Sequence, residues 1–260
     1  MTAAPLTVMT YNLKHGGTGE HAWVDRCSLL VDIVRRHDPD LIAVQEALVD
    51  QVDDLRRAFP DHDVVGQGRD GGEAGEWAAL LFRRSRLELT SESVFWLSDT
   101  PDVPATNTWG ALYMRMATLG RFHDRESGAD LTVLTAHADN EQGPHGDETR
   151  VRSAALIVER LADEHGPVLV MGDFNEGAGL GAASTPFRDA GFVDLWTVAG
   201  DPDDDTDSFN GWHSPTRRGV RIDWVLGRGA VTAEHLLIDH DGPETWAASD
   251  HFPVVARIVL

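Results

Sequence analysis

Residues 168–175 read Val168-Leu169-Val170-Met171-Gly172-Asp173-Phe174-Asn175. Four apolar residues in a row are typical of a buried strand, and the glycine that follows them ends the run. Asp173 and Asn175 stand two positions apart, so on an extended backbone their side chains can point to the same side. The stretch therefore predicts a buried strand that delivers a carboxylate and an amide into one cleft.

Polar residues follow other apolar runs of this chain in the same way. Residues 7–11 lead to Asn12, 41–44 lead to Gln45 and Glu46, 131–135 lead to His137 and Asp139, and Asp250 and His251 precede the last run, 252–260. One such strand end would be weak support for a site. Five of them aimed at one cleft would form an active site.

The rest of the chain shows many short strands and few helices in mixed order. Apolar spacing predicts helices at residues 21–37, 49–59, 148–164 and 185–190. Further strands are predicted at 61–66, 77–83, 87–96, 112–119, 131–137, 222–226, 231–238 and 253–259. Because no repeat or long linker divides the 260 residues, we expect one α/β or α+β domain over residues 1–260.

The charge of the chain bears on its partners. Asp and Glu number 43 against 22 Lys and Arg, which gives a net charge of −21, and Lys14 is the only lysine. A protein that grips duplex nucleic acid without sequence preference usually neutralises about 6–10 phosphates with basic side chains. The charge therefore disfavours duplex nucleic acid as a partner and favours a small phosphorylated molecule.

Composition also bears on location. No apolar stretch approaches the roughly 20 residues of a membrane span, and residues 1–5 show neither a basic region nor an apolar leader. Cys27 is the only cysteine, so no intrachain disulfide can form, and its place in a helical pattern predicts a packed thiol. We expect a cytoplasmic monomer without a membrane span.

Six short motifs follow one another along the chain: Thr10-Tyr11-Asn12-Leu13, Gln45-Glu46, His137-Ala138-Asp139, Gly172-Asp173-Phe174-Asn175, Arg221-Ile222-Asp223-Trp224 and Ser249-Asp250-His251-Phe252-Pro253. In kind and order this set resembles the endonuclease/exonuclease/phosphatase superfamily, the metal-dependent phosphoesterases that include deoxyribonuclease I and neutral sphingomyelinase. The resemblance covers almost the whole chain. It implies a four-layered α/β/β/α sandwich of two packed mixed sheets flanked by helices, with the site at one edge of the sheets.

The resemblance also implies a metal site. Glu46 matches the central metal ligand of the family, Asn12 lies beside it, and Asp250 is expected to contribute to metal or water binding. A carboxylate suits Mg²⁺, a hard ion that prefers oxygen ligands and keeps several waters. The expected cofactor is Mg²⁺, with Mn²⁺ as the alternative.

Five further residues are expected to carry the chemistry. Hydrolysis of a phosphoester needs charge neutralisation, an activated water and help for the leaving group. Asp173 is the candidate to orient or deprotonate the water, and Asn175 to donate to a phosphoryl oxygen. His251 is expected to donate to the same group as a cation oriented by Asp223, and His137 to contact the phosphate from the other side.

Each of these residues alone has a structural interpretation. Asn12 could be a turn residue, Glu46 could cap a helix, and Asp173 with Asn175 could form an Asx turn. Either histidine could be a hydrogen-bonded packing residue. Their joint occurrence in one order favours the functional interpretation.

Five other residues are candidates for contact with the substrate. Lys14 stands where some nucleases of the family carry another acidic ligand, and a cation there speaks against a two-metal site. Trp212 and Trp246 are candidates to stack on a flat group, although core packing is the commoner role of tryptophan. Arg217 and Arg218 could clamp a terminal phosphate, or they could simply face solvent.

The sequence thus predicts a Mg²⁺- or Mn²⁺-dependent phosphoesterase that hydrolyses a phosphodiester or phosphomonoester by direct attack of water. A small metabolite or a lipid headgroup is the preferred substrate class. Two alternatives stay open: a nuclease that acts on DNA or RNA, and a catalytically silent protein that binds a phosphorylated ligand or a partner.

Overall fold

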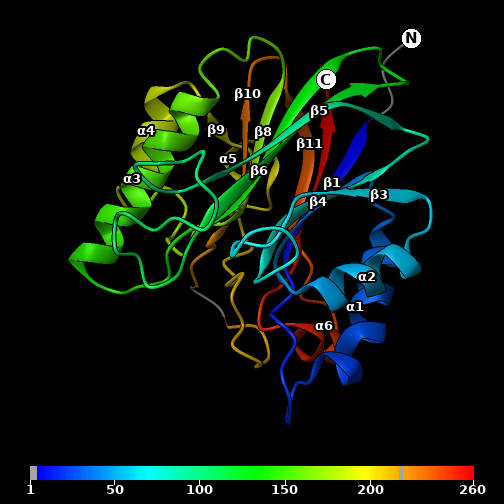
Figure 1. Cartoon of the computed structure of the whole chain (residues 1–260). Helices are drawn as coiled ribbons and strands as arrows, with labels where there is room; N and C mark the ends of the chain where they lie inside the picture. Colours follow the sequence, from blue (N-terminus) through cyan, green and yellow to red (C-terminus); the bar gives the residue numbers. More distant parts are fainter. Residues whose placement is uncertain (1–4, 217–218) are drawn as a thin grey trace.

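Two sheets of six strands each lie at the centre of the molecule and pack against one another (Figure 1). The computed structural model describes residues 5–216 and 219–260. The first sheet contains, in spatial order, β11 (Thr232–Ile238), β12 (Val254–Val259), β1 (Leu6–Asn12), β2 (Leu41–Ala47), β4 (Trp77–Arg83) and β3 (His62–Val65). The second sheet contains β5 (Leu87–Trp96), β6 (Met116–Asp124), β7 (Asp130–His137), β8 (Val168–Asp173), β10 (Asp223–Arg228) and β9 (Val193–Asp194).

Helices cover the outer face of each sheet, as Figure 1 shows. The helices on the first sheet are α1 (Trp23–His37), α2 (Val49–Ala58) and α6 (Pro243–Ala248). Those on the second are α3 (Pro144–Arg160) and α4 (Ser184–Asp189). The short α5 (Trp196–Ala199) contacts β9 and β11. This four-layered α/β/β/α arrangement confirms the predicted fold.

Strand β1 shows why the apolar runs of the sequence are nearly continuous. Alternate side chains of a strand point to opposite faces. Leu6 and Val8 lie in the core between the two sheets, whereas Met9 and Tyr11 lie in the core beneath α1 and α2. Because both faces are covered, both sets of side chains are apolar.

Each sheet has a parallel pair near its middle, and these pairs position the polar residues. Strands β1 and β2 are parallel in the first sheet, and β7 and β8 are parallel in the second. The carboxyl ends of two parallel strands lie at the same edge of a sheet. Asn12 and Glu46 therefore share one edge, and His137 and Asp173 are register partners at the end of the other pair.

The structure corrects the predicted strand at residues 112–119. Strand β6 begins at Met116 and continues to Asp124, and the side chains of Leu112 and Tyr113 are exposed. Gly120 and the polar residues after it weakened the strand pattern. In the fold, a Cβ at Gly120 would lie 2.6 Å from the ring of Phe122, so this position accommodates a packed ring.

The helix predicted at residues 148–164 begins earlier, at Pro144, and ends at Arg160. Proline is tolerated in the first helical turn because its missing N–H would have no intrahelical partner there. Gly143 precedes it with a φ of 95°, a conformation that glycine adopts without steric cost. A Gly- and Pro-containing stretch that looked like a loop is thus a helix start.

Among the described residues, no helix combines the length and the apolar character that crossing a membrane requires. The thiol of Cys27 in α1 is half-buried against the core beneath the helices, as predicted for a packed cysteine.

Candidate active site

Asn12 connects the two sheets at the edge where the parallel strands end. Its Nδ2 donates to Oε1 of Glu46 at 3.1 Å and to Oδ2 of Asp173 at 2.9 Å. Asn12 is fully buried, and Asp173 is 161 positions away in the sequence. The structure therefore brings together three residues that the sequence predicted to share one cleft.

Glu46 occupies an irregular position in β2. Its φ is 59°, and the pairing of β2 with β4 shifts register between Val44 and Ala47. A bulge of this kind re-aims a side chain near a strand end. The neighbouring Gln45 is buried and hydrogen-bonds Thr10 and Thr135 inside the molecule.

The carboxylate of Glu46 is held in its ionised form. Burial alone would raise its pKa, but His137, Lys14 and the Asn12 amide outweigh this effect and lower the pKa to about 2. The backbone N–H of His15 also donates to Oε2 at 3.3 Å. Glu46 therefore offers a negative charge at the mouth of the site.

Asp173 lies between two imidazoles. Its Oδ2 is 3.5 Å from Nε2 of His137 and 3.6 Å from Nε2 of His251, and its Oδ1 accepts from the backbone N–H of Asn175 at 2.9 Å. Burial raises the pKa of Asp173, His251 lowers it and Asp223 raises it, which leaves it at about 7. A carboxyl group with this pKa can gain or lose a proton near neutral pH.

His251 and Asp223 form a buried pair. Nδ1 of His251 lies 2.9 Å from Oδ2 of Asp223, while Nε2 faces Asp173. Burial would lower the pKa of His251, but Asp223 and Asp173 outweigh it and raise the pKa to about 10. The imidazole is therefore a cation at neutral pH, and its Nδ1 lies against the carboxylate of Asp223.

His137 differs from His251 in charge. Burial, and after it the nearby Arg115, hold the pKa of His137 well below its ordinary value. The ring is therefore neutral at physiological pH. Asn175, with a φ of 51°, lies next to it and donates from Nδ2 to the carbonyl of Ala138 at 3.1 Å.

Lys14 lies between two carboxylates. Its Nζ is 3.6 Å from Oε2 of Glu46 and 3.3 Å from Oδ2 of Asp250. Burial would lower the pKa of Lys14, but both carboxylates outweigh it and raise the pKa. Lys14 is thus a fixed ammonium group in the site, not a free surface lysine.

Arg26 of α1 holds the loop that carries Lys14. Its guanidinium is buried and lies over the rings of Trp23 and Trp212. Its hydrogen bonds among the described residues go to five backbone carbonyls, those of Leu13, Lys14, His15, His21 and Ala248. Ser249 adds a bond from its hydroxyl to the carbonyl of Asn12, at 2.7 Å. These contacts fix the segment after β1 against the segment that contains Asp250 and His251.

The donor atoms around Glu46 fit a hard divalent cation. Ligand atoms of His15, Glu46 and Glu76 lie within 4.8 Å of one another, on the partly exposed side of the site. Asp250 adds a buried Oδ1 without a hydrogen-bond partner in the described chain. Oxygen-rich donor sets of this kind suit Mg²⁺ or Mn²⁺.

Asp173, Asp223 and His251 form a second cluster with the same spacing. All three side chains are buried, and His251 already binds Asp223 and faces Asp173. This arrangement suits proton handling better than the binding of an ion.

A small open cavity of about 10 Å³, room for about one water, lies beside Glu46 and His137, and the sequence had not pointed to it. Its other lining residues are Arg69, Glu76, Trp77, Ala78, Met114, Arg115 and Met116. The antiparallel pairing of Ala47 with Trp77 explains why Glu76 lies near Glu46. The register of this strand pair was the only signal that Glu76 lies near Glu46, and the register cannot be read from the sequence alone.

The structure describes two of the four remaining candidates for substrate contact. The ring of Trp212 stacks on His21, with ring centroids 3.9 Å apart and an interplanar angle of 8°, so one face is already covered. Trp246 is half-buried against the core between the sheets. Arg217 and Arg218 lie outside the described residues.

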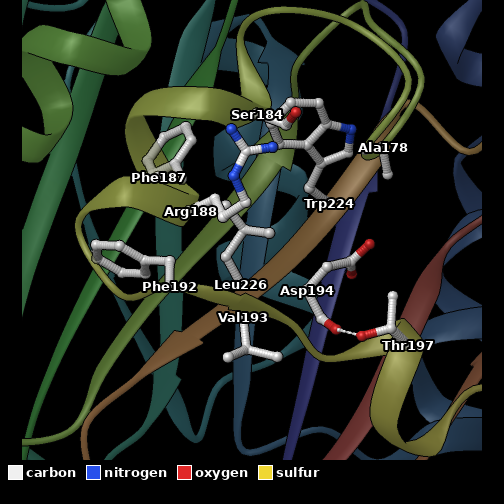
Figure 2. A pocket seen from close by; sticks show the side chains of 11 residues that line it. Ala178, Ser184, Phe187, Arg188, Phe192, Val193, Asp194, Thr197, Trp224 and Leu226 are labelled. Carbon is white, nitrogen blue, oxygen red and sulfur yellow. Dashed lines mark hydrogen bonds between the residues drawn. The ribbon is translucent and has the colours of Figure 1, made fainter.

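A separate cavity has a volume of about 310 Å³ and lies beside α4. Phe187, Trp224 and Leu226 are among its lining residues (Figure 2). It shares no lining residue with the cavity beside Glu46. Its walls are mainly apolar and carry none of the predicted catalytic groups.

The strand ends of this sandwich gather carboxylates, amides and imidazoles at one edge, and these are groups that phosphoester hydrolysis can use. Residues 9–251 match the model of the Endonuclease/Exonuclease/phosphatase family, so the chain belongs to this family.

Similar proteins include two bacterial ones of known structure. The endonuclease/exonuclease/phosphatase of Bacteroides vulgatus is 27% identical with a TM-score of 0.89, and the match covers 98% of this chain and 99% of the other. The mannosyl-6-phosphatase of Bacteroides thetaiotaomicron is 25% identical with a TM-score of 0.87, over 98% and 100% of the two chains.

Human Tyrosyl-DNA phosphodiesterase 2 is 23% identical over 77% of this chain and 52% of its own length. A second curated relative, an uncharacterised protein of Acanthamoeba polyphaga mimivirus, is 25% identical over 60% of each chain. The matches thus span only about half to 60% of the length of these curated relatives.

Proposed function

We propose that this chain is a divalent-metal-dependent phosphoesterase that hydrolyses a phosphodiester or phosphomonoester of a small metabolite or lipid headgroup by direct attack of water. The observation that carries the proposal is the position of Asp173. Its carboxylate accepts a hydrogen bond from Asn12 and faces both His137 and His251. Asn12 also donates to the ionised Glu46, so one residue connects Asp173 to Glu46.

Glu46, with Asn12 and Asp250 beside it, would hold the divalent ion. When bound, the ion supplies positive charge that neutralises a phosphoryl oxygen. The fixed ammonium of Lys14 lies between Glu46 and Asp250, where it already neutralises much of their charge. This position favours a site with a single ion.

The other side chains act on the attacking water and on the phosphoryl group. Asp173, with its pKa near 7, orients the attacking water and accepts its proton. The His251 cation donates from Nε2 to the phosphoryl group, and Asp223 holds the ring in that orientation. Asn175 donates to a phosphoryl oxygen, and the neutral His137 contacts the phosphoryl group from the opposite side.

Two observations support a small substrate. The net charge of −21 would repel a polyanion. Among the similar structures, the mannosyl-6-phosphatase matches with a TM-score of 0.87 and 25% identity, above the 0.76 and 16% of D. rerio TDP2 complexed with single-strand DNA product. Trp212, whose ring stacks on His21 and lies 5.5 Å from the Arg26 guanidinium, is proposed to contact the organic part of the substrate with its remaining edge.

The direct test is turnover of bis-p-nitrophenyl phosphate and p-nitrophenyl phosphate with Mg²⁺, with Mn²⁺ and with chelator. We expect turnover that chelator abolishes, and a loss of about a hundredfold or more in Asp173→Ala. The matched control is Asp130→Ala, which removes an exposed carboxylate at the start of β7, at the opposite end of the strand from His137. This variant should turn over both substrates like wild type. Equal rates in all samples would favour a catalytically silent binding protein.

Three predictions from the sequence accompany the proposal: residues 1–260 form one domain, the chain is a monomer, and it works in the cytoplasm. Light scattering coupled to gel filtration tests the second. Limited proteolysis tests the first, because one domain should resist cleavage without a stable half-length fragment.

A further inference from the structure

His15 lies beside Glu46 on the exposed side of the site. Its backbone N–H donates to Oε2 of Glu46 at 3.3 Å, and Arg26 donates to its carbonyl oxygen at 3.2 Å. A ring nitrogen of His15 and one carboxylate oxygen each of Glu46 and Glu76 lie within 4.8 Å of one another. Ligands about 2.0–2.2 Å from one metal ion lie roughly 3–4.4 Å apart. These three donor atoms are therefore close enough to share an ion.

The ring of His15 presents a nitrogen lone pair. Its Nδ1 lies 3.3 Å from the carbonyl oxygen of Gly16, which can only accept a hydrogen bond. In the neutral ring Nδ1 therefore carries the hydrogen, and Nε2 keeps its lone pair. Metal-binding histidines usually donate their other ring N–H to a carbonyl or a carboxylate in this way. His15 thus has the hydrogen bonding of a ligand histidine.

Glu76 offers a second carboxylate to the same ion. The pairing of Ala47 with Trp77 across β2 and β4 brings it near Glu46. Arg69 donates to its two oxygens at 2.7 and 2.9 Å. An ionised carboxylate has about four lone-pair sites, so these bonds leave sites for an ion. Carboxylates that bind metals are commonly oriented by such outer hydrogen bonds.

Nearby cations reduce the negative charge of this donor set. Nζ of Lys14 lies 3.6 Å from Oε2 of Glu46, and Arg69 forms a salt bridge with Glu76. Mg²⁺ binds oxygen ligands mainly through charge, so this neutralisation weakens its binding. First-row transition-metal ions gain more than Mg²⁺ from an imidazole nitrogen, and Co²⁺ gains more than Mn²⁺. The nitrogen of His15 is therefore the group that distinguishes between these ions.

We propose that His15 and Glu76, together with Glu46, are ligands of the divalent ion of this site, and that the His15 nitrogen makes the site select a first-row transition-metal ion, with Mn²⁺ as the first candidate, over Mg²⁺. The inference rests on the proposed phosphoesterase function and narrows its cofactor. The expectation of Mg²⁺ from the sequence considered oxygen ligands alone, and His15 adds a nitrogen.

The test uses the full-length protein and the metal ions alone, without substrate. Calorimetric titrations with Mg²⁺, Mn²⁺ and Co²⁺ give three dissociation constants for wild type, His15→Ala and Glu76→Gln. In His15→Ala the affinity should fall by about tenfold or more for Co²⁺, by less for Mn²⁺ and least for Mg²⁺. Glu76→Gln should weaken the binding of all three ions by similar factors, because it removes an oxygen ligand.

Pulsed electron paramagnetic resonance of bound Mn²⁺ assigns the nitrogen directly. The ¹⁴N coupling of a coordinated imidazole should be present in wild type and Glu76→Gln and absent in His15→Ala. The matched control is His123→Ala, which removes an exposed histidine that pairs with Asp130 at the far end of β6. This variant should keep the coupling and all three dissociation constants. Circular dichroism verifies that each variant is folded.

Three results would overturn the assignment of His15. The first is wild-type protein that binds none of the ions, or binds Mn²⁺ without ¹⁴N coupling. The second is coupling that persists in His15→Ala. The third is a His15→Ala variant that binds all three ions as wild type does, or more weakly by one common factor. Failure of the phosphoesterase proposal looks different: Mn²⁺ would be bound through nitrogen, but bis-p-nitrophenyl phosphate would not be turned over.

Discussion

Asp223 and His251 form a buried carboxylate–imidazole pair, with 2.9 Å between Oδ2 of the former and Nδ1 of the latter. They belong to different sheets: Asp223 begins β10, and His251 lies just before β12. The pair therefore exists only when the two sheets are packed. It keeps the histidine charged and points its other nitrogen at Asp173.

Replacement of Asp223 by Asn should reduce kcat by about a hundredfold, because the cation loses its nearest opposite charge. The pKa of His251 should fall from its value of about 10, which NMR titration of the ring can follow. The control is Asp130→Asn, which removes the carboxylate of an exposed pair with His123 that has the same 2.9 Å spacing. An unchanged His251 titration in Asp223→Asn would contradict the role assigned to the pair.

Lys14 should limit the number of divalent ions that the site accepts. We expect wild type to bind a single Mn²⁺ per chain, and Lys14→Gln to bind Mn²⁺ more tightly because a competing cation is removed between Glu46 and Asp250. Calorimetry and electron paramagnetic resonance measure stoichiometry and affinity without reference to turnover. Binding of two ions by wild type, or weaker binding by the variant, would be the opposite outcome.

Duplex DNA should be a poor substrate. The net charge of −21 opposes its approach, so turnover of bis-p-nitrophenyl phosphate should exceed cleavage of single- and double-stranded oligonucleotides with fluorescent labels. Efficient DNA cleavage that falls steeply as salt is added would show that phosphate contacts drive binding. That result would favour the nuclease alternative.

Asp239 should make stability depend on pH. Burial raises its pKa, but His37 and Arg36, both 2.6 Å from its Oδ2, outweigh burial and lower the pKa. Because the folded-state pKa is the lower one, the stabilisation is present above the unfolded-state value of about 4 and is lost as pH falls through the folded-state value.

Asp239→Asn should therefore cost about 1–3 kcal/mol of unfolding free energy near neutral pH and less at about pH 3, below the unfolded-state pKa. Urea denaturation at both pH values provides the measurement. Asp241→Asn, two positions along and without a salt bridge in the described chain, serves as the control. If Asp239→Asn lowered the unfolding free energy equally at both pH values, the charge of Asp239 would not be the cause of the stabilisation.

The fold was largely predictable because its signals are local. Buried strands such as 168–171 give continuous apolar runs, and the polar residues at their ends mark the edge of the sheet. The predicted end of β6 was too early because the strand contains Gly120 and charged residues beyond it. Strand β9 and helix α5 have two and four residues, too few to show a period.

The candidate site was predictable where a motif carries it and not elsewhere. Asn12, Glu46 and Asp173 stand at strand ends that the sequence marks. Parallel pairing brings Asn12 to Glu46, and the packing of the two sheets brings Asp173 to Asn12. Arg115 and Glu76 stand at ordinary positions before strands, and only the register of β4 and the packing of the two sheets bring them to Glu46. Long-range register of this kind leaves no mark in a single sequence.

Arg26 attaches the Lys14 loop through main-chain oxygens, whatever side chains the loop bears. Exchanges at positions 14 and 15 would thus retain the anchor while altering side chains at the site. Substitutions in this loop can therefore change the chemistry of the site without disturbing the two sheets. Directed variation of the loop is a direct way to alter substrate specificity.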